Sequence, residues 1–143
     1  MIDYSKFEKS LRNLKLQLDN YWNAAERPEL RDIDREAISE SVIQRFKICY
    51  DCLWKLLKRY LHEILGIPEL PNSPKPLFRI AFENLLIAKI EQWLVYADAR
   101  VDTSHDYSRK KAQAAITNAF EFAQDAAALY QKMTGKLFNE TGD

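Results

Sequence analysis

The sequence predicts an all-α protein, an up-and-down bundle of about four main helices formed by a single domain over residues 1–143. Apolar residues recur at intervals of three and four over long stretches, the spacing that places them on one face of a helix. The chain has only 3 glycines and 5 prolines, too few for a fold with many turns. No alternation of apolar and polar residues, the pattern of a half-buried strand, continues for long.

The first two helices are expected over residues 3–25 and 34–65, with Pro28 in the interruption between them. Asp34 is a plausible N-cap of the second helix, and Gly66 is well placed as its C-cap. The second helix should be central, because apolar residues cover a broad part of its circumference. The apolar positions are Phe7, Leu11, Leu14, Leu18, Tyr21 and Trp22 in the first helix, and Val42, Phe46, Cys49, Leu53, Leu57, Tyr60 and Ile64 in the second.

Two further helices are expected over residues 77–97 and 108–137, followed by a frayed polar tail at 138–143. The segment between the second and third helices, 66–76, contains four of the five prolines and is predicted to be a stiff loop. The third and fourth helices should be antiparallel neighbours, because a short polar stretch joins them. Their apolar positions include Phe78, Phe82, Leu85, Leu86, Trp93 and Leu94, then Ala112, Ala115, Ile116, Ala119, Phe120, Ala123, Ala127, Tyr130 and Met133.

Composition excludes several classes of protein. The 21 basic and 21 acidic residues cancel, which argues against a protein that wraps DNA by bulk charge. No apolar run is long enough for a membrane span, and the charged N-terminus does not resemble a signal peptide. Cys49 and Cys52 form a C-x-x-C pattern without a second cysteine or histidine pair, so we expect them to pack in the core and to bind no metal ion. We also expect no cofactor. The cysteines are most simply explained by a reducing, cytoplasmic location.

The junction between the third and fourth helices carries the strongest functional pattern. Its sequence, DARVDTSHDYS at 98–108, contains Arg100, His105 and Tyr107. A histidine titrates near neutral pH and suits proton transfer, while an arginine can grip a phosphate with two hydrogen bonds. A purely structural alternative is that Arg100 and His105 only hydrogen-bond to helix-end carbonyl groups and hold the junction together.

With these residues in view, the sequence resembles HEPN-domain proteins over nearly its whole length. Within them it is similar to nucleotidyltransferase substrate-binding proteins and the related HepT toxins. The resemblance is carried by residues 34–61 with Phe46 and Trp54-Lys55, by Ser73-Pro74, by AFENLLI at 81–87 and by TSHDYS at 103–108.

The resemblance implies a homodimer in which two copies of the motif face each other and cut RNA without a metal ion. Arg100 and His105 would be the catalytic pair. A small nucleotidyltransferase of the MNT type would be the partner and antitoxin, and it would attach AMP to Tyr107. The alternative is a non-catalytic subunit that binds substrate for the nucleotidyltransferase. Val101 favours this alternative, because RNase-active members usually carry a polar residue there, most often asparagine.

The basic run after the motif is a candidate RNA-binding patch. Arg109, Lys110 and Lys111 fall in the first turn of the expected fourth helix, where cations oppose the helix dipole. A phosphate-binding role therefore explains them slightly better than a helix-stabilising role, although an ordinary solvated face remains an alternative. Asp102, Ser104 and Asp106 are interpreted as turn and cap residues.

Overall fold

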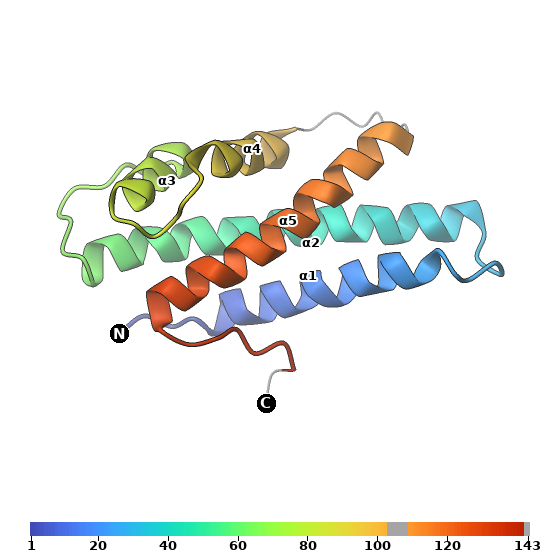
Figure 1. Cartoon of the computed structure of the whole chain (residues 1–143), viewed down its shortest axis with the longest axis horizontal. Helices are drawn as coiled ribbons and strands as arrows, with labels where there is room; N and C mark the ends of the chain where they lie inside the picture. Colours follow the sequence, from blue (N-terminus) through green and yellow to red (C-terminus); the bar gives the residue numbers. More distant parts are fainter. Residues whose placement is uncertain (103–108, 142–143) are drawn as a thin grey trace.

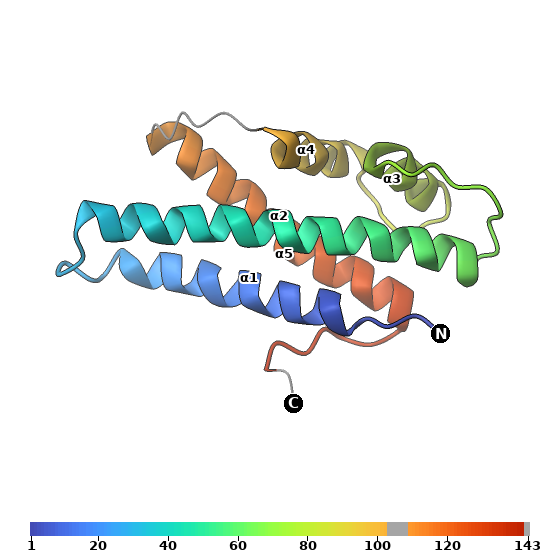
Figure 2. The ribbon, with the colours of Figure 1, turned by 180° about the vertical axis from the view of Figure 1, so that it is seen from behind.

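The computed structural model describes the backbone of residues 1–102 and 109–141 and the side chains of residues 1–102 and 111–141. Its five helices are α1 (Ser5–Ala24), α2 (Asp32–Glu63), α3 (Pro74–Glu83), α4 (Ile90–Val101) and α5 (Arg109–Thr134). Helices α1 and α2 lie side by side as an antiparallel hairpin, α5 crosses them obliquely, and α3 and α4 follow one another along α2 (Figures 1 and 2). The all-α prediction is confirmed, and no strand occurs in the described residues.

The predicted third helix is two helices, which corrects the expected number of main helices from four to five. The chain leaves α3 at Leu85, whose φ of 63° lies in the left-handed region. There the Leu86 amide donates to the Ala81 carbonyl at 2.9 Å and the Leu85 amide to the Phe82 carbonyl at 3.1 Å. This pair of bonds is the Schellman motif that ends many helices. Leucine rarely adopts this conformation, so apolar periodicity alone suggested a continuous helix.

Three other helix boundaries differ from the expectations. Asp34 is the third residue of α2 rather than its N-cap, and its carboxylate accepts the backbone N–H of Arg31 at 3.0 Å. The C-cap of α2 is Ile64 rather than Gly66, which follows two residues later with a φ of 72°. Helix α5 ends at Thr134 instead of 137, because Gly135 turns at a φ of 74° and donates to the Gln131 carbonyl at 2.8 Å.

Leu11, Leu14 and Leu18 are buried along α1, while an aromatic cluster joins α3 and α4 to α2 and α5. The cluster consists of Phe46, Tyr50, Phe78, Trp93, Tyr96 and Phe122. Phe122 is at its centre, with ring centroids 5.1 Å from Phe46 and 5.4 Å from Tyr96. Helices α4 and α5 are in contact, as predicted, although α5 crosses α4 at an angle (Figure 1).

Several residues expected in the core are exposed. They are Trp22, Ile64, Phe82, Leu85 and Phe120. Trp22 is 50% exposed although it lies on the apolar stripe of the first predicted helix, whereas Trp93 is buried as predicted. Among the described helices, none combines the length and apolar character that crossing a bilayer requires.

Candidate functional site

Arg100 lies in the last turn of α4 and reaches across to the middle of α2. Its Nε donates to Oδ1 of Asp51 at 3.1 Å, and its Nη2 donates to Oδ2 at 2.9 Å. This two-pronged arrangement fixes the plane of the guanidinium as well as its position. About a third of the side chain remains exposed, 33% for Arg100 and 38% for Asp51. The arginine is therefore oriented by the protein and still accessible from outside.

The electrostatics of this pair keep Arg100 charged. Hydrogen bonding to Asp51 raises the pKa of the guanidinium above its usual value, and this outweighs the opposing effect of partial burial. A guanidinium has five N–H groups, and Asp51 accepts two of them. No described residue accepts the other three, which are suited to a further acceptor such as a phosphate. The neighbouring Tyr50 is buried, and desolvation together with the Asp51 carboxylate raises the pKa of its phenol.

Asp51 is a site residue that the sequence reasoning missed. The structural alternative for Arg100 assumed bonds to helix-end carbonyl groups, but the partner is a carboxylate 49 positions earlier in the chain. One signal was present. Asp51 is the single charged residue in the stretch ICYDCLW at 48–54, where an unpaired carboxylate would be unfavourable.

The residues around Arg100 define the end of α4. Val101, the last residue of the helix, is 69% exposed, and the Asp102 amide donates to the Asp98 carbonyl at 3.1 Å. The Asp98 carboxylate forms an ion pair with Nζ of Lys75 at 2.6 Å, which joins the start of α3 to α4.

The structure does not bring the whole predicted motif together, because part of it is not described. The motif residues Ser104, His105, Asp106 and Tyr107 lie outside the described residues. Arg109, Lys110 and Lys111 are the first three residues of α5, as predicted, and the Lys111 side chain is exposed.

The C-x-x-C pattern is part of the core, as predicted. Cys49 is fully buried, and this burial raises the pKa of its thiol to about 12, which makes it a poor metal ligand and nucleophile. Cys52 is partly buried against the same core, and both cysteines are free. In the described part of the chain, no three histidine, cysteine or acidic side chains are grouped to hold a metal ion.

Comparison with known proteins decides the family. A family model described as nucleotidyltransferase substrate binding protein like matches residues 2–135. The chain belongs to this family. The resemblance inferred from residues 34–61 and the motif is thereby confirmed.

Individual proteins similar to this chain are consistent with the family. A protein named probable ribonuclease HepT, from Haemophilus influenzae, is 26% identical over 103 residues, which cover 71% of this chain and 70% of that protein. A solved Haemophilus influenzae structure, described as the fold of a substrate-binding domain of a nucleotidyltransferase, superposes with a TM-score of 0.80 at 20% identity. That match covers 92% of this chain and 98% of the other.

A crystal structure of a Thermus thermophilus protein is also similar. It has a TM-score of 0.63 and 24% identity, and the match covers 85% of this chain and 98% of that one. At these identities the two structural likenesses establish the shared fold of the helical bundle.

Proposed function

We propose that this protein is the HEPN-type partner of a small nucleotidyltransferase and that it cuts RNA without a metal ion. Arg100 and His105 form the catalytic pair of this proposal, and Tyr107 is the residue to which the nucleotidyltransferase attaches AMP. The observation that carries the proposal is the two-pronged Asp51–Arg100 pair at the end of α4.

The proposed chemistry uses the N–H groups of Arg100 that Asp51 does not accept. A scissile phosphate gains negative charge as the 2′-oxygen attacks, and a fixed guanidinium stabilises that charge without having to reorient. A histidine of ordinary pKa can take the 2′-hydroxyl proton or give a proton to the leaving 5′-oxygen. Asp51 is a positioning residue in this scheme, because it touches Arg100 and not the RNA.

The relatives support the same class of activity. One is named a probable ribonuclease, and the family is described by its link to nucleotidyltransferases. The proposal further includes a homodimer in which two copies of the motif face each other. Arg109, Lys110 and Lys111 contact the RNA backbone. The chain forms one domain over 1–143 and is located in the cytoplasm. AMP on Tyr107 would silence the enzyme by filling the site with charge and bulk.

A second candidate is a non-catalytic subunit that binds substrate for the nucleotidyltransferase. The exposed side chain of Val101 supports it, because valine has no polar group with which to hold a ribose or a phosphate. The two candidates differ in whether the purified protein cuts RNA.

The deciding experiment is RNA cleavage by the purified chain, with variants of Asp51. Asp51→Ala should lower kcat on the order of 10- to 100-fold, because a misoriented catalytic group is costly. Its stability should change by about 1 kcal/mol or less, since the pair is partly exposed. The matched control is Asp98→Ala, which removes a more exposed carboxylate of another ion pair and should leave kcat unchanged.

The remaining outcomes separate the two candidates. Cleavage that is lost in His105→Ala and weakened in Asp51→Ala establishes the nuclease. Absence of cleavage by the wild-type chain, together with a stable complex with the nucleotidyltransferase, selects the binding subunit. After incubation with ATP and the nucleotidyltransferase, a mass gain of AMP that is lost in Tyr107→Phe identifies the modified residue.

A further inference from the structure

Helix α2 has an acidic part and a basic part. Residues 32–40 contain four acidic residues and one arginine, whereas residues 52–62 contain two lysines, one arginine and no acidic residue. The chain as a whole has equal numbers of acidic and basic residues, so the asymmetry is local. Asp51, which orients Arg100, stands directly before the basic part.

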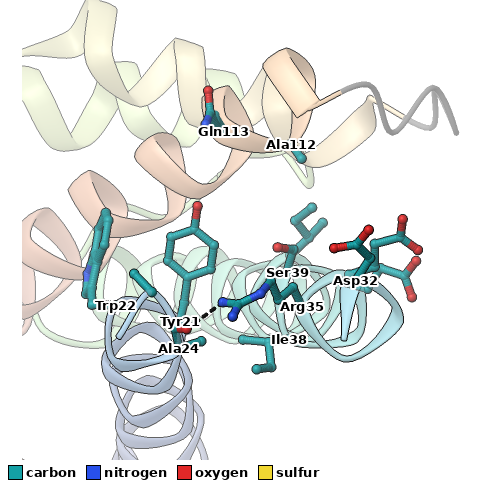
Figure 3. A pocket seen from close by; sticks show the side chains of 13 residues that line it. Tyr21, Trp22, Ala24, Asp32, Arg35, Ile38, Ser39, Ala112 and Gln113 are labelled. Atoms are coloured by element: carbon teal, nitrogen blue, oxygen red, sulfur yellow. Dashed lines mark hydrogen bonds between the residues drawn. The ribbon is translucent and has the colours of Figure 1, made fainter. Parts of the chain in front are cut away.

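The acidic part of α2 borders a cavity of about 630 Å³ between α1, α2 and α5 (Figure 3). The lining includes Trp22 of α1 and three acidic residues of α2, Asp32, Glu36 and Glu40. Carboxylates repel the phosphate backbone of a nucleic acid. An RNA strand bound at Arg100 is therefore expected to extend toward the basic part of α2.

Lys55 stands one turn beyond Asp51 on the same side of α2. At this spacing of four residues, a carboxylate and a lysine readily form an ion pair. Here the Asp51 carboxylate is bonded to Arg100 instead, and no carboxylate of the described residues pairs with Lys55. The Lys55 ammonium lies 5.8 Å from the centroid of the Trp54 ring, a contact that orients the charge without neutralising it.

Lys58 stands two turns beyond Asp51 and is also without a carboxylate partner in the part of the chain that the structure describes. Its Nζ donates to the side-chain oxygen of Asn72 at 3.2 Å, a neutral group in the segment before α3. The adjacent Arg59, by contrast, is paired with Glu63 at 3.1 Å. Both lysines thus keep a positive charge that no described carboxylate offsets.

The two lysines continue a line of positive charge that begins at Arg100. The rise of an α-helix places Lys55 about 6 Å and Lys58 about 10 Å beyond Asp51 along the axis. The rotations relative to Asp51 are about 40° and about 20°, so the three side chains emerge on one flank of α2. Lys55 is exposed and Lys58 is partly exposed, and ligands can reach both ammonium groups from outside.

We propose that the RNA strand held at Arg100 continues along α2 and places neighbouring phosphates on Lys55 and Lys58. This inference rests on the proposed function in one respect, because it assumes that Arg100 contacts RNA. A lysine ammonium is a point charge on a flexible stem, so it suits the phosphate backbone and adds affinity without reading the base sequence. The continuity with the free donors of Arg100 favours RNA over an acidic protein surface as the occupant.

Fluorescence anisotropy of the full chain with a labelled, short, single-stranded RNA tests the path. The probe carries 2′-fluoro groups in place of its 2′-hydroxyls, so it has no attacking oxygen and is not cut during the titration. The double variant Lys55→Gln, Lys58→Gln should bind roughly tenfold more weakly at low salt. Its plot of log K against log salt should be shallower by about 1.4, because each phosphate contact on a single strand contributes about 0.7.

The matched control is Lys6→Gln, Lys9→Gln, which should bind the probe as the wild type does. It removes the same charge from two exposed lysines at the same spacing on α1. Helix α1 lies across α2 from α3 and α4, away from the proposed path (Figures 1 and 2).

Two further variants separate phosphate binding from folding. Lys55→Arg, Lys58→Arg keeps both charges and should bind the probe as the wild type does, because a guanidinium also contacts phosphate. Lys55→Gln alone leaves the bond to Asn72 in place and should still make the salt dependence shallower by about 0.7.

Cleavage of unmodified RNA, measured in parallel, distinguishes failure of this inference from failure of the proposed function. If the wild type cuts RNA and both glutamine double variants bind the probe equally, the path along α2 is wrong and the nuclease stands. If the wild type binds the probe through Lys55 and Lys58 but cuts nothing, the path stands and the nuclease is wrong. The inference is also overturned if the wild type does not bind the probe, or if loss of the two lysines weakens only the complex with the nucleotidyltransferase.

Discussion

The α1–α2 hairpin and the α3–α4 segment bury their apolar side chains in different ways. Along the hairpin, Leu11, Leu14 and Leu18 recur every three or four residues, and all three are buried. Along α3 and α4, Phe78 and Trp93 are buried in the aromatic cluster, while Phe82, Leu85, Val95 and Val101 are exposed.

The difference shows when periodicity predicts burial. Two long antiparallel helices cover each other's faces over many turns, so most of the apolar stripe is buried, and Trp22 near the end of α1 is an exception. Short helices meet their neighbours over a turn or two, and residues at their ends extend past the contact. The α3–α4 segment is accordingly held by a few large aromatic contacts rather than by a continuous stripe.

The largest expected effect comes from removing one of those aromatic contacts. Phe78→Ala should lower the free energy of unfolding by about 3–5 kcal/mol, because Phe78 is fully buried against Tyr50 and Trp93. Urea denaturation measures the loss. Hydrogen exchange should show faster opening in α3 and α4 than in the α1–α2 hairpin.

The control for this experiment lies one turn along the same helix. Phe82 is 41% exposed, so Phe82→Ala should cost about 1 kcal/mol or less. Equal losses for the two variants would show that α3 packs through a different face, and the contrast drawn with the hairpin would not hold.

An intermediate effect concerns the tyrosine that ties α5 to the hairpin. The hydroxyl of Tyr130 donates to the Glu8 carboxylate at 2.5 Å, and burial followed by this bond raises the pKa of the tyrosine to about 12. An unfolded tyrosine titrates near 10. The folded state therefore retains a proton that the unfolded state loses, and the stability present below pH 10 should fall as the pH rises from 10 to 12.

Denaturation midpoints measured across this range test the assignment. Tyr130→Phe should make the fall with pH shallower without abolishing it, because Tyr50 and Tyr96 also have raised pKa values. An unchanged slope would mean that Tyr130 does not contribute to the alkaline loss of stability.

The smallest expected effect is a gain at the break between α3 and α4. Leu85 adopts a φ of 63° with 82% of its surface exposed, so the side chain adds strain and little packing. Leu85→Gly should raise the free energy of unfolding by about 0.5–1 kcal/mol, because glycine adopts this conformation without a steric penalty. A lower denaturation midpoint in Leu85→Gly than in the wild type would show that the leucine makes a stabilising contact.

Much of the fold was predictable from local patterns. Periodicity placed α1, α2 and α5 within about three residues at each end, and Gly66 has a positive φ shortly after α2. The break at Leu85 was not predictable in the same way, because the residue there is apolar, in step with the helical period and not a glycine.

In the candidate site, too, some residues were predictable from the sequence and others were not. Arg100 was identified from the sequence, and its position in the last turn of α4 agrees with a junction between helices. Asp51 was not identified, nor was the cavity beside Trp22, because each depends on which helices meet. The roles of His105 and Tyr107 remain predictions, to be tested by the cleavage and mass measurements above.

The sequence by itself determined the helical class, the long hairpin and the family, because these depend on spacing within one or two turns and on residue types along the chain. Only the tertiary structure decided that Asp51 orients Arg100, that Trp22 is exposed and that three carboxylates share a cavity. The physical reason is distance along the chain. Whether a side chain contacts a partner 49 positions away depends on how two helices dock, and the docking depends on the packing of the whole bundle.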